Sequence, residues 1–186
     1  MTGSKKDRDL WQESSPLARV QETLLPAQEG EVLELDEMWA YVGLCGLMWA
    51  YVGSKKNPVW LWIALCRRTR QVVAWHHGSR SMVCCRQLWE KIPDAYKTGL
   101  VFTDFWRAYQ GVVPDNQHRP CAKREGETNH VERFNLTLRQ RIGRLTRKTL
   151  SFSKSHLMHL IHIRLFFLDY NQNQARRFNI ARLTYS

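Results

Sequence analysis

The chain has 186 residues, of which 44% are hydrophobic, so it can bury the core of one domain and is not a disordered tail. Its N-terminus is polar and its longest notable apolar stretch, residues 58–66, is far shorter than the roughly 18 residues of a membrane span, so we expect a cytoplasmic protein without a membrane segment. The formal net charge is +11, and residues 104–186 hold 15 of the 28 Lys and Arg but only 6 of the 17 Asp and Glu.

A basic half of this kind suits phosphate binding, because neutralising phosphates releases condensed counterions. The alternative is a solvated basic face that only keeps the protein soluble. The five cysteines include no CxxC pair, so the sequence favours neither a disulfide framework nor a cysteine zinc site.

The predicted elements indicate an α/β fold. Residues 1–33 are polar and contain Pro16, Pro26 and Gly30, which predicts an N-terminal arm or linker. Apolar runs predict three strands, joined by short turns into an antiparallel meander, over residues 32–42, 59–66 and 71–76. A helix is predicted over residues 82–92 and a short apolar strand over 100–103. Because a helix between two strands usually returns the chain to pair in parallel, the order of elements predicts a mixed sheet covered by helices.

Residues 128–148 predict a long amphipathic helix. One stripe of this helix is apolar and faces the core: Val131, Phe134, Leu138, Ile142 and Leu145. Another side is basic: Arg133, Arg141, Arg144, Arg147 and Lys148. Glu132 and Arg139 lie two turns apart at the border between the two sides. An ordinary surface helix is the alternative, but an acid where a core edge meets a basic groove argues against it.

Three acids belong to elements that can meet in the fold. Asp36 lies in the first strand, Asp104 ends the strand over 100–103, and Glu132 lies on the helix. Carboxylates on neighbouring strands and on a covering helix can hold Mg²⁺ or Mn²⁺, and two such ions would support in-line attack on a phosphodiester. Taken singly, Asp36 is one of several acids in its strand, and Asp104 could cap a helix starting at Phe105.

Four segments resemble, in order, the transposases of the insertion sequence one family, a branch of the DDE transposases. They read ELDEMWAYVG, SKKNPVWLWIAL, FTDFWRAY and HVERFNLTLRQRIGRLTRKTLSFSKS. The resemblance implies an RNase H-like catalytic domain over residues 34–170, followed by a basic C-terminal tail over 171–186. It implies metal-dependent strand cleavage and strand transfer at the ends of an insertion element. Asp36, Asp104 and Glu132 correspond to the metal-binding catalytic acids, and Arg139 to a basic residue that contacts DNA near the cleavage point.

The resemblance also implies partners. These are double-stranded DNA, as element ends and as target, and further copies of the chain assembled on that DNA. Such transposases usually carry an upstream zinc-binding and helix-turn-helix region, and residues 1–33 are too short for both modules and contain no Cys or His. A separate upstream end-recognition protein is therefore a candidate partner.

A repeat of MWAYVG occupies residues 38–43 and again 48–53. Because the period of ten is even, a slip by one repeat keeps every side chain on its face of the sheet. If the second copy formed the strand, Gly46 would replace Asp36 and the site would be dead. We expect that Asp36 is displaced or its strand badly supported, because the slipped register keeps the short turn GSKKNP into Val59, whereas the intact register leaves apolar side chains of the second copy to be exposed or re-paired. The alternative function is therefore a DNA-binding remnant without catalysis. A third alternative is a related structure-selective nuclease, which the sequence favours less than the other two.

Overall fold

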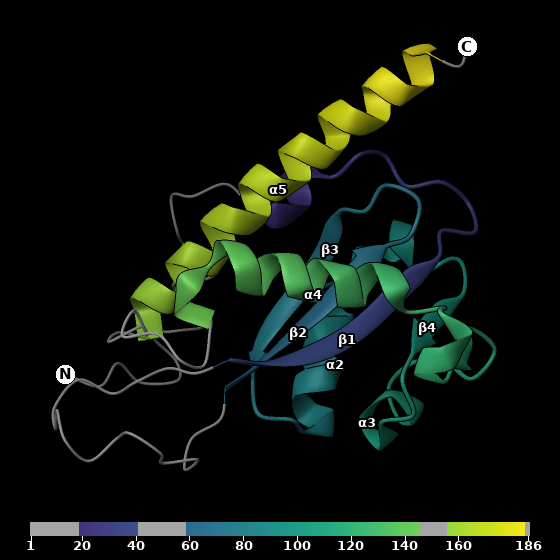
Figure 1. Cartoon of the computed structure of the whole chain (residues 1–186). Coiled ribbons are helices and arrows are strands. Elements are labelled where there is room, and N and C mark those ends of the chain that lie inside the picture. Colours follow the sequence, from purple (N-terminus) through teal and green to yellow (C-terminus); the bar gives the residue numbers. More distant parts are fainter. Residues whose placement is uncertain (1–18, 41–58, 146–155, 185–186) are drawn as a thin grey trace, which may run out of the picture.

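The structure, a computed structural model, describes residues 19–40, 59–145 and 156–184. The described residues form a mixed α/β fold around a five-stranded sheet with the order β3-β2-β1-β4-β5 (Figure 1). The strands span Leu33–Ala40 (β1), Val59–Cys66 (β2), Val72–Gly78 (β3), Val101–Thr103 (β4) and His118–Pro120 (β5). None of the described helices is long and apolar enough to cross a membrane.

The first three strands form the predicted antiparallel meander. β1 pairs with β2 over its whole length, from Leu33 opposite Cys66 to Ala40 opposite Val59. β2 pairs in turn with β3, with one irregularity after Ala64. The bounds of β2 match those of the predicted strand. The prediction succeeded here because a continuous run of apolar and aromatic residues is typical of a strand buried on both faces.

The chain then crosses over to the other side of β1. Helix α2 (Met82–Lys91) leads to β4, which pairs in parallel with β1, as predicted. A further strand, β5, pairs in parallel with β4. It was not predicted, because its three residues, His118 to Pro120, carry no apolar pattern.

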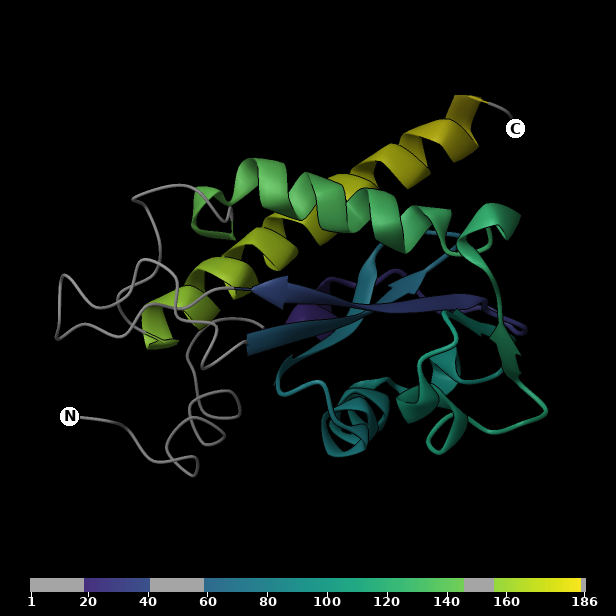
Figure 2. The same ribbon diagram turned by 60° about the horizontal axis from the view of Figure 1, so that its bottom comes forward.

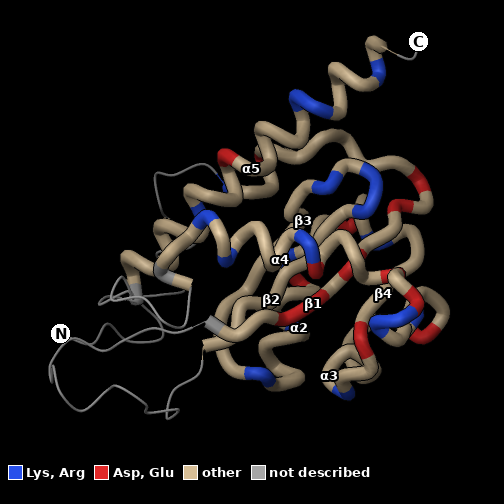
Figure 3. Tube along the Cα trace, viewed as in Figure 1, with Lys and Arg blue, Asp and Glu red and all other residues tan. Residues whose placement is uncertain are grey.

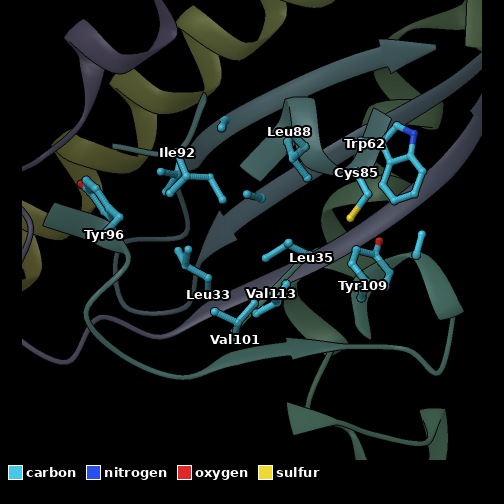
Figure 4. Close-up of a cluster of buried hydrophobic side chains, with 14 of the residues drawn as sticks. Leu33, Leu35, Trp62, Cys85, Leu88, Ile92, Tyr96, Val101, Tyr109 and Val113 are labelled. Atoms are coloured by element: carbon cyan, nitrogen blue, oxygen red, sulfur yellow. The ribbon is translucent and has the colours of Figure 1, made fainter. Parts of the chain in front are cut away.

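Helices cover both faces of the sheet. α2 and the short α3 (Arg107–Gln110) lie on one face, and α4 (Asn129–Arg141) and α5 (His156–Thr184) lie on the other (Figure 2). Each face has its own core. The core under α2 contains Leu33, Leu35, Trp62, Leu88 and Tyr109, among others (Figure 4). The core under α4 and α5 contains all five residues of the predicted apolar stripe: Val131, Phe134, Leu138, Ile142 and Leu145.

Helix α4 is shorter than predicted. It ends at Arg141, and Ile142 adopts an extended backbone, with φ −103° and ψ 90°. Gly143 follows, and glycine is a poor helix former. Residues Gly143–Leu145 form the 3₁₀ turn η4, so Arg144 is not on the helix. Arg147 and Lys148 lie outside the described residues.

Segments near both ends of the described chain, η1 and the first half of α5, pack against the sheet. Val20, in the 3₁₀ turn η1 (Val20–Thr23), is buried beside α5, within the range predicted as an arm. α5 continues without a break through residue 170, where the basic tail was predicted to begin. The side chain of Asn171 is fully buried, donates to the carbonyl oxygen of Val72 at 2.9 Å and accepts from the amide of Val72 at 2.8 Å. This amide therefore substitutes for a neighbouring strand at the edge strand β3.

The first copy of the repeat forms β1. Met38, Trp39 and Ala40 pair with Leu61, Trp60 and Val59, and Asp36 stands opposite Ile63. The expected displacement of Asp36 is therefore wrong for this structure. The physical reason is the set of buried contacts that Glu34 and Asp36 make, described below, which a slip by ten residues would remove. The second copy, residues 48–53, lies outside the described residues.

Replacing Asn171 with Ala should lower the free energy of unfolding by about 2 to 3 kcal/mol. The change leaves a buried N–H and a buried C=O of Val72 without their partners. Urea unfolding measures the effect. The exposed neighbour Gln172, replaced with Ala, should shift the free energy by no more than about 0.5 kcal/mol. Equal effects of the two changes would show that the amide does not hold α5 on β3.

Candidate functional site

Two of the predicted acids meet where β1 and β4 run side by side. Leu33 is level with Val101 and Glu34 with Phe102, so this parallel register, continued by two residues, brings Asp104 level with Asp36. Asp36, Glu37 and Asp104 each offer a carboxylate oxygen within 4.8 Å of the other two. The described residues therefore contain a compact acidic cluster built from two neighbouring strands.

Asp36 points to the face of the sheet that α4 covers. Its Oδ2 accepts a hydrogen bond from Asn135 Nδ2 of α4 at 2.7 Å. Burial, together with the charges of Glu37 and Asp104, raises the pKa of Asp36 to about 7, although the bond from Asn135 opposes the shift. The half-buried carboxyl group of Asp36 therefore keeps its proton to a higher pH than an exposed aspartate does.

Glu132 lines the same pocket as the other two predicted acids. This pocket has a volume of about 320 Å³, and Asp36, Asp104, Glu132 and Arg139 are among its lining residues. Oε1 of Glu132 accepts a hydrogen bond from Thr128 Oγ1 at 3.0 Å. The structure therefore brings the predicted acids to one pocket, although Glu132 is not a member of the tightest cluster.

Glu37 was not predicted as part of the site. Its side chain points to the opposite face from Asp36, where Oε2 accepts from the Tyr109 hydroxyl at 2.6 Å and Oε1 from Arg80 Nε at 2.7 Å. Burial raises the pKa of the Glu37 carboxyl, while the bonds from Tyr109 and Arg80 lower it. Both oxygens of Glu37 are thus engaged by partners more than 40 residues away, which no local pattern could reveal.

Arg80 was also missed, and it brings a cation to the acidic pocket. Its guanidinium carbon lies 4.7 Å from the ring centre of Trp60 and 4.0 Å from that of Trp106. Cation–π contacts of this kind hold a guanidinium in place. Since Arg80 also lines the pocket and pairs with Glu37, one wall of the pocket is a fixed positive charge.

A further buried acid, Glu34, fixes α4 over the site. Its Oε2 accepts hydrogen bonds from the backbone amides of His130 and Val131 at 3.0 Å each, in the first turn of α4. Its Oε1 pairs with Arg67 Nε at 2.8 Å. A carboxylate at a helix N-terminus is stabilised by the helix dipole and by the free N–H groups there. Glu34 therefore sets where α4, and with it Glu132, meets β1.

The arginines of α4 are divided between two pockets. Arg139 lines the pocket with the acids, whereas Arg133 and Arg141 line a second pocket that α4 shares with α5. Figure 3 shows acidic positions along β1 and basic positions along α4 and α5. Arginines of one helix thus line two separate pockets. That the basic side of this helix lines a DNA groove beside the acids stays a prediction.

Replacing Asp36 with Asn should stabilise the protein at neutral pH. An acid whose pKa is raised from 3.8 to about 7 by folding costs stability above pH 4, and the cost is complete above pH 7. The variant should therefore unfold with a free energy higher by roughly 1 to 3 kcal/mol at pH 8, and with little difference near pH 4.

Urea unfolding at the two pH values measures this difference. The exposed Asp115, replaced with Asn, is the matched control and should change the free energy by less than about 0.5 kcal/mol at both. A wild type that is the more stable protein at pH 8 would contradict the burial of a charged Asp36.

Comparison with known proteins matches this chain to one family. The family model described as IS1 transposase matches residues 31–173. The insertion element iso-IS1n protein InsB of Shigella dysenteriae is 37% identical over 130 residues, which cover 69% of this chain and 87% of that protein. The insertion element IS1 protein InsB of Shigella flexneri is 39% identical over 111 residues, or 60% of this chain and 82% of that protein. The chain therefore belongs to the IS1 transposase family.

Proposed function

We propose that this chain cleaves and joins DNA strands at the ends of an insertion element, with Asp36, Asp104 and Glu132 as its catalytic acids. One observation carries the proposal. Acids from three separate segments line one pocket, together with Arg139. The family assignment supports the reaction class, and the pocket supports the choice of residues.

The acids suit divalent cations. Mg²⁺ and Mn²⁺ prefer hard oxygen ligands, and the carboxylate oxygens of Asp36 and Asp104 lie within 4.8 Å of each other. Burial and the acidic neighbours raise the pKa of Asp36, and a bound cation would offset this repulsion between the carboxylates. Two such ions would activate the attacking water or hydroxyl and stabilise the leaving oxygen.

The remaining residues of the pocket orient these groups. Asn135 holds Oδ2 of Asp36, and Thr128 holds Oε1 of Glu132. Glu37 is occupied by Arg80 and Tyr109, so we assign it the role of supporting the cluster rather than that of a ligand. We assign to Arg139, which is exposed and lines the same pocket, the role of holding a phosphate of the strand being cut.

We further propose that residues 34–170 are an RNase H-like catalytic domain. The family resemblance implies this fold, and a mixed sheet covered by helices on both faces supports it. The proposed partners are double-stranded DNA, as element ends and target, further copies of the chain assembled on it, and an upstream end-recognition protein.

A catalytically silent, DNA-binding remnant is the second candidate. The observation that favours it is the duplicated MWAYVG segment, which adds residues between β1 and β2. The position of Asp36 in β1 favours the active alternative. Strand cleavage is therefore the property that separates the two.

Metal-dependent nicking of element-end DNA should be detected with Mg²⁺ or Mn²⁺, and EDTA should abolish it. Replacing Asp36 or Asp104 with Asn, or Glu132 with Gln, should lower the cleavage rate by roughly 100-fold or more, because a metal ligand is removed, while DNA binding persists. Asp115 replaced with Asn controls for the loss of a surface acid and should cut normally. DNA binding without cleavage in the wild type would identify the silent remnant.

A further inference from the structure

We propose that the pocket between α4 and α5 is a second phosphate site, which binds a backbone phosphate of DNA on the opposite edge of α4 from the acids. It has a volume of about 420 Å³, and four arginines from three elements of the fold line it: Arg70, Arg133, Arg141 and Arg177. The choice of DNA as the source of the phosphate rests on the proposed function.

The side chains that line the pocket carry positive charge and no negative charge. His130 and the polar side chains of Tyr170, Asn173 and Gln174 complete much of the lining, and no described lining residue carries a carboxylate. No ion pair between described residues involves any of the four arginines. Guanidinium groups that converge in this way match the oxygens of a phosphate.

Arg70 is the residue that most strongly indicates a ligand. It ends the turn between β2 and β3 with φ 61°, a left-handed conformation that arginine rarely adopts and that glycine or asparagine would suit better. Its Nη1 is buried and has no hydrogen-bond partner. Disfavoured backbone conformations are typical of ligand-binding sites, and this one holds Arg70 in the lining of the basic pocket.

The electrostatics of the pocket also favour an anion. Burial lowers the pKa of Arg70, and the charges of Arg67 and Arg133 lower it further, against the opposing effect of Glu34. A bound phosphate would relieve this repulsion.

DNA is the favoured source of the phosphate because α4 serves both pockets. Arg133 and Arg141 face the basic pocket, and Glu132 and Arg139 face the acidic one. The positions between the two sides, such as Leu136 and Gln140, are exposed. A nucleic acid strand lying over the outer face of α4 could therefore touch both pockets at once.

Inorganic phosphate is the first probe, added to the full chain at constant ionic strength. The Tm of the wild type should rise with phosphate and saturate, because a ligand of the folded state stabilises it. The Tm of the double variant Arg133→Gln/Arg177→Gln should not respond. Arg70→Asn, which keeps a residue suited to a left-handed turn, should also lose the response.

The matched control is Arg86→Gln/Arg176→Gln, which removes two exposed arginines that do not line the pocket. It should respond to phosphate as the wild type does. An equal Tm response in the control and in the double pocket variant would overturn the phosphate site.

A DNA duplex is the second probe. The slope of log Kobs for DNA against log salt should become shallower by about 0.9 for each phosphate that the pocket variant no longer neutralises, and by less in the control. Equal slopes, with phosphate binding intact, would mean that the pocket takes free phosphate and would overturn the DNA assignment. A wild type that passes both tests but cuts no DNA would refute the proposed catalysis alone.

Discussion

The buried carboxylate of Glu34 is the interaction on which the site depends. It joins the first turn of α4 to β1 and to Arg67, whose guanidinium also binds Glu127 and lies over the ring of Phe102. Glu34 and Asp36 lie on the same face of β1. The hydrogen bonds that hold the start of α4 on Glu34 therefore also fix the distance between α4 and Asp36. Asn135 then meets Asp36, and Glu132 reaches the same pocket. Breaking such a buried pair costs about 3 to 5 kcal/mol, because one charge is left unpaired.

The same contacts explain why the duplication does not displace β1. A slip by ten residues would put Leu44 at the place of Glu34 and Gly46 at that of Asp36. Arg67 and the first amides of α4 would then lose their acceptor, and Asn135 would lose Asp36. The expectation of a slip rested mainly on the apolar side chains of the second copy, at about 1.5 to 3 kcal/mol for each one left in water. The buried polar contacts oppose it, and they favour the register that the structure adopts.

Much of the sheet was predictable because its signals are local. The bounds of β2, the meander and the parallel return to β4 follow from apolar runs and connection lengths. The three acids of β1, Glu34, Asp36 and Glu37, could not be told apart in this way. What separates them is a distant partner: the start of α4 for the first, Asn135 for the second, and Arg80 with Tyr109 for the third. Arg70 was missed for the same reason, since its backbone conformation and its pocket exist only in the folded chain.

The central claim is that Asp36 and Asp104 hold a divalent cation in the intact register of β1. Anomalous X-ray scattering from a crystal of the full chain grown with Mn²⁺ tests it most directly. We expect a manganese peak in contact with the carboxylates of Asp36 and Asp104, and no such peak in crystals of the Asp36→Asn variant. A peak bound elsewhere, or a well-ordered cluster without a peak at saturating Mn²⁺, would contradict the claim.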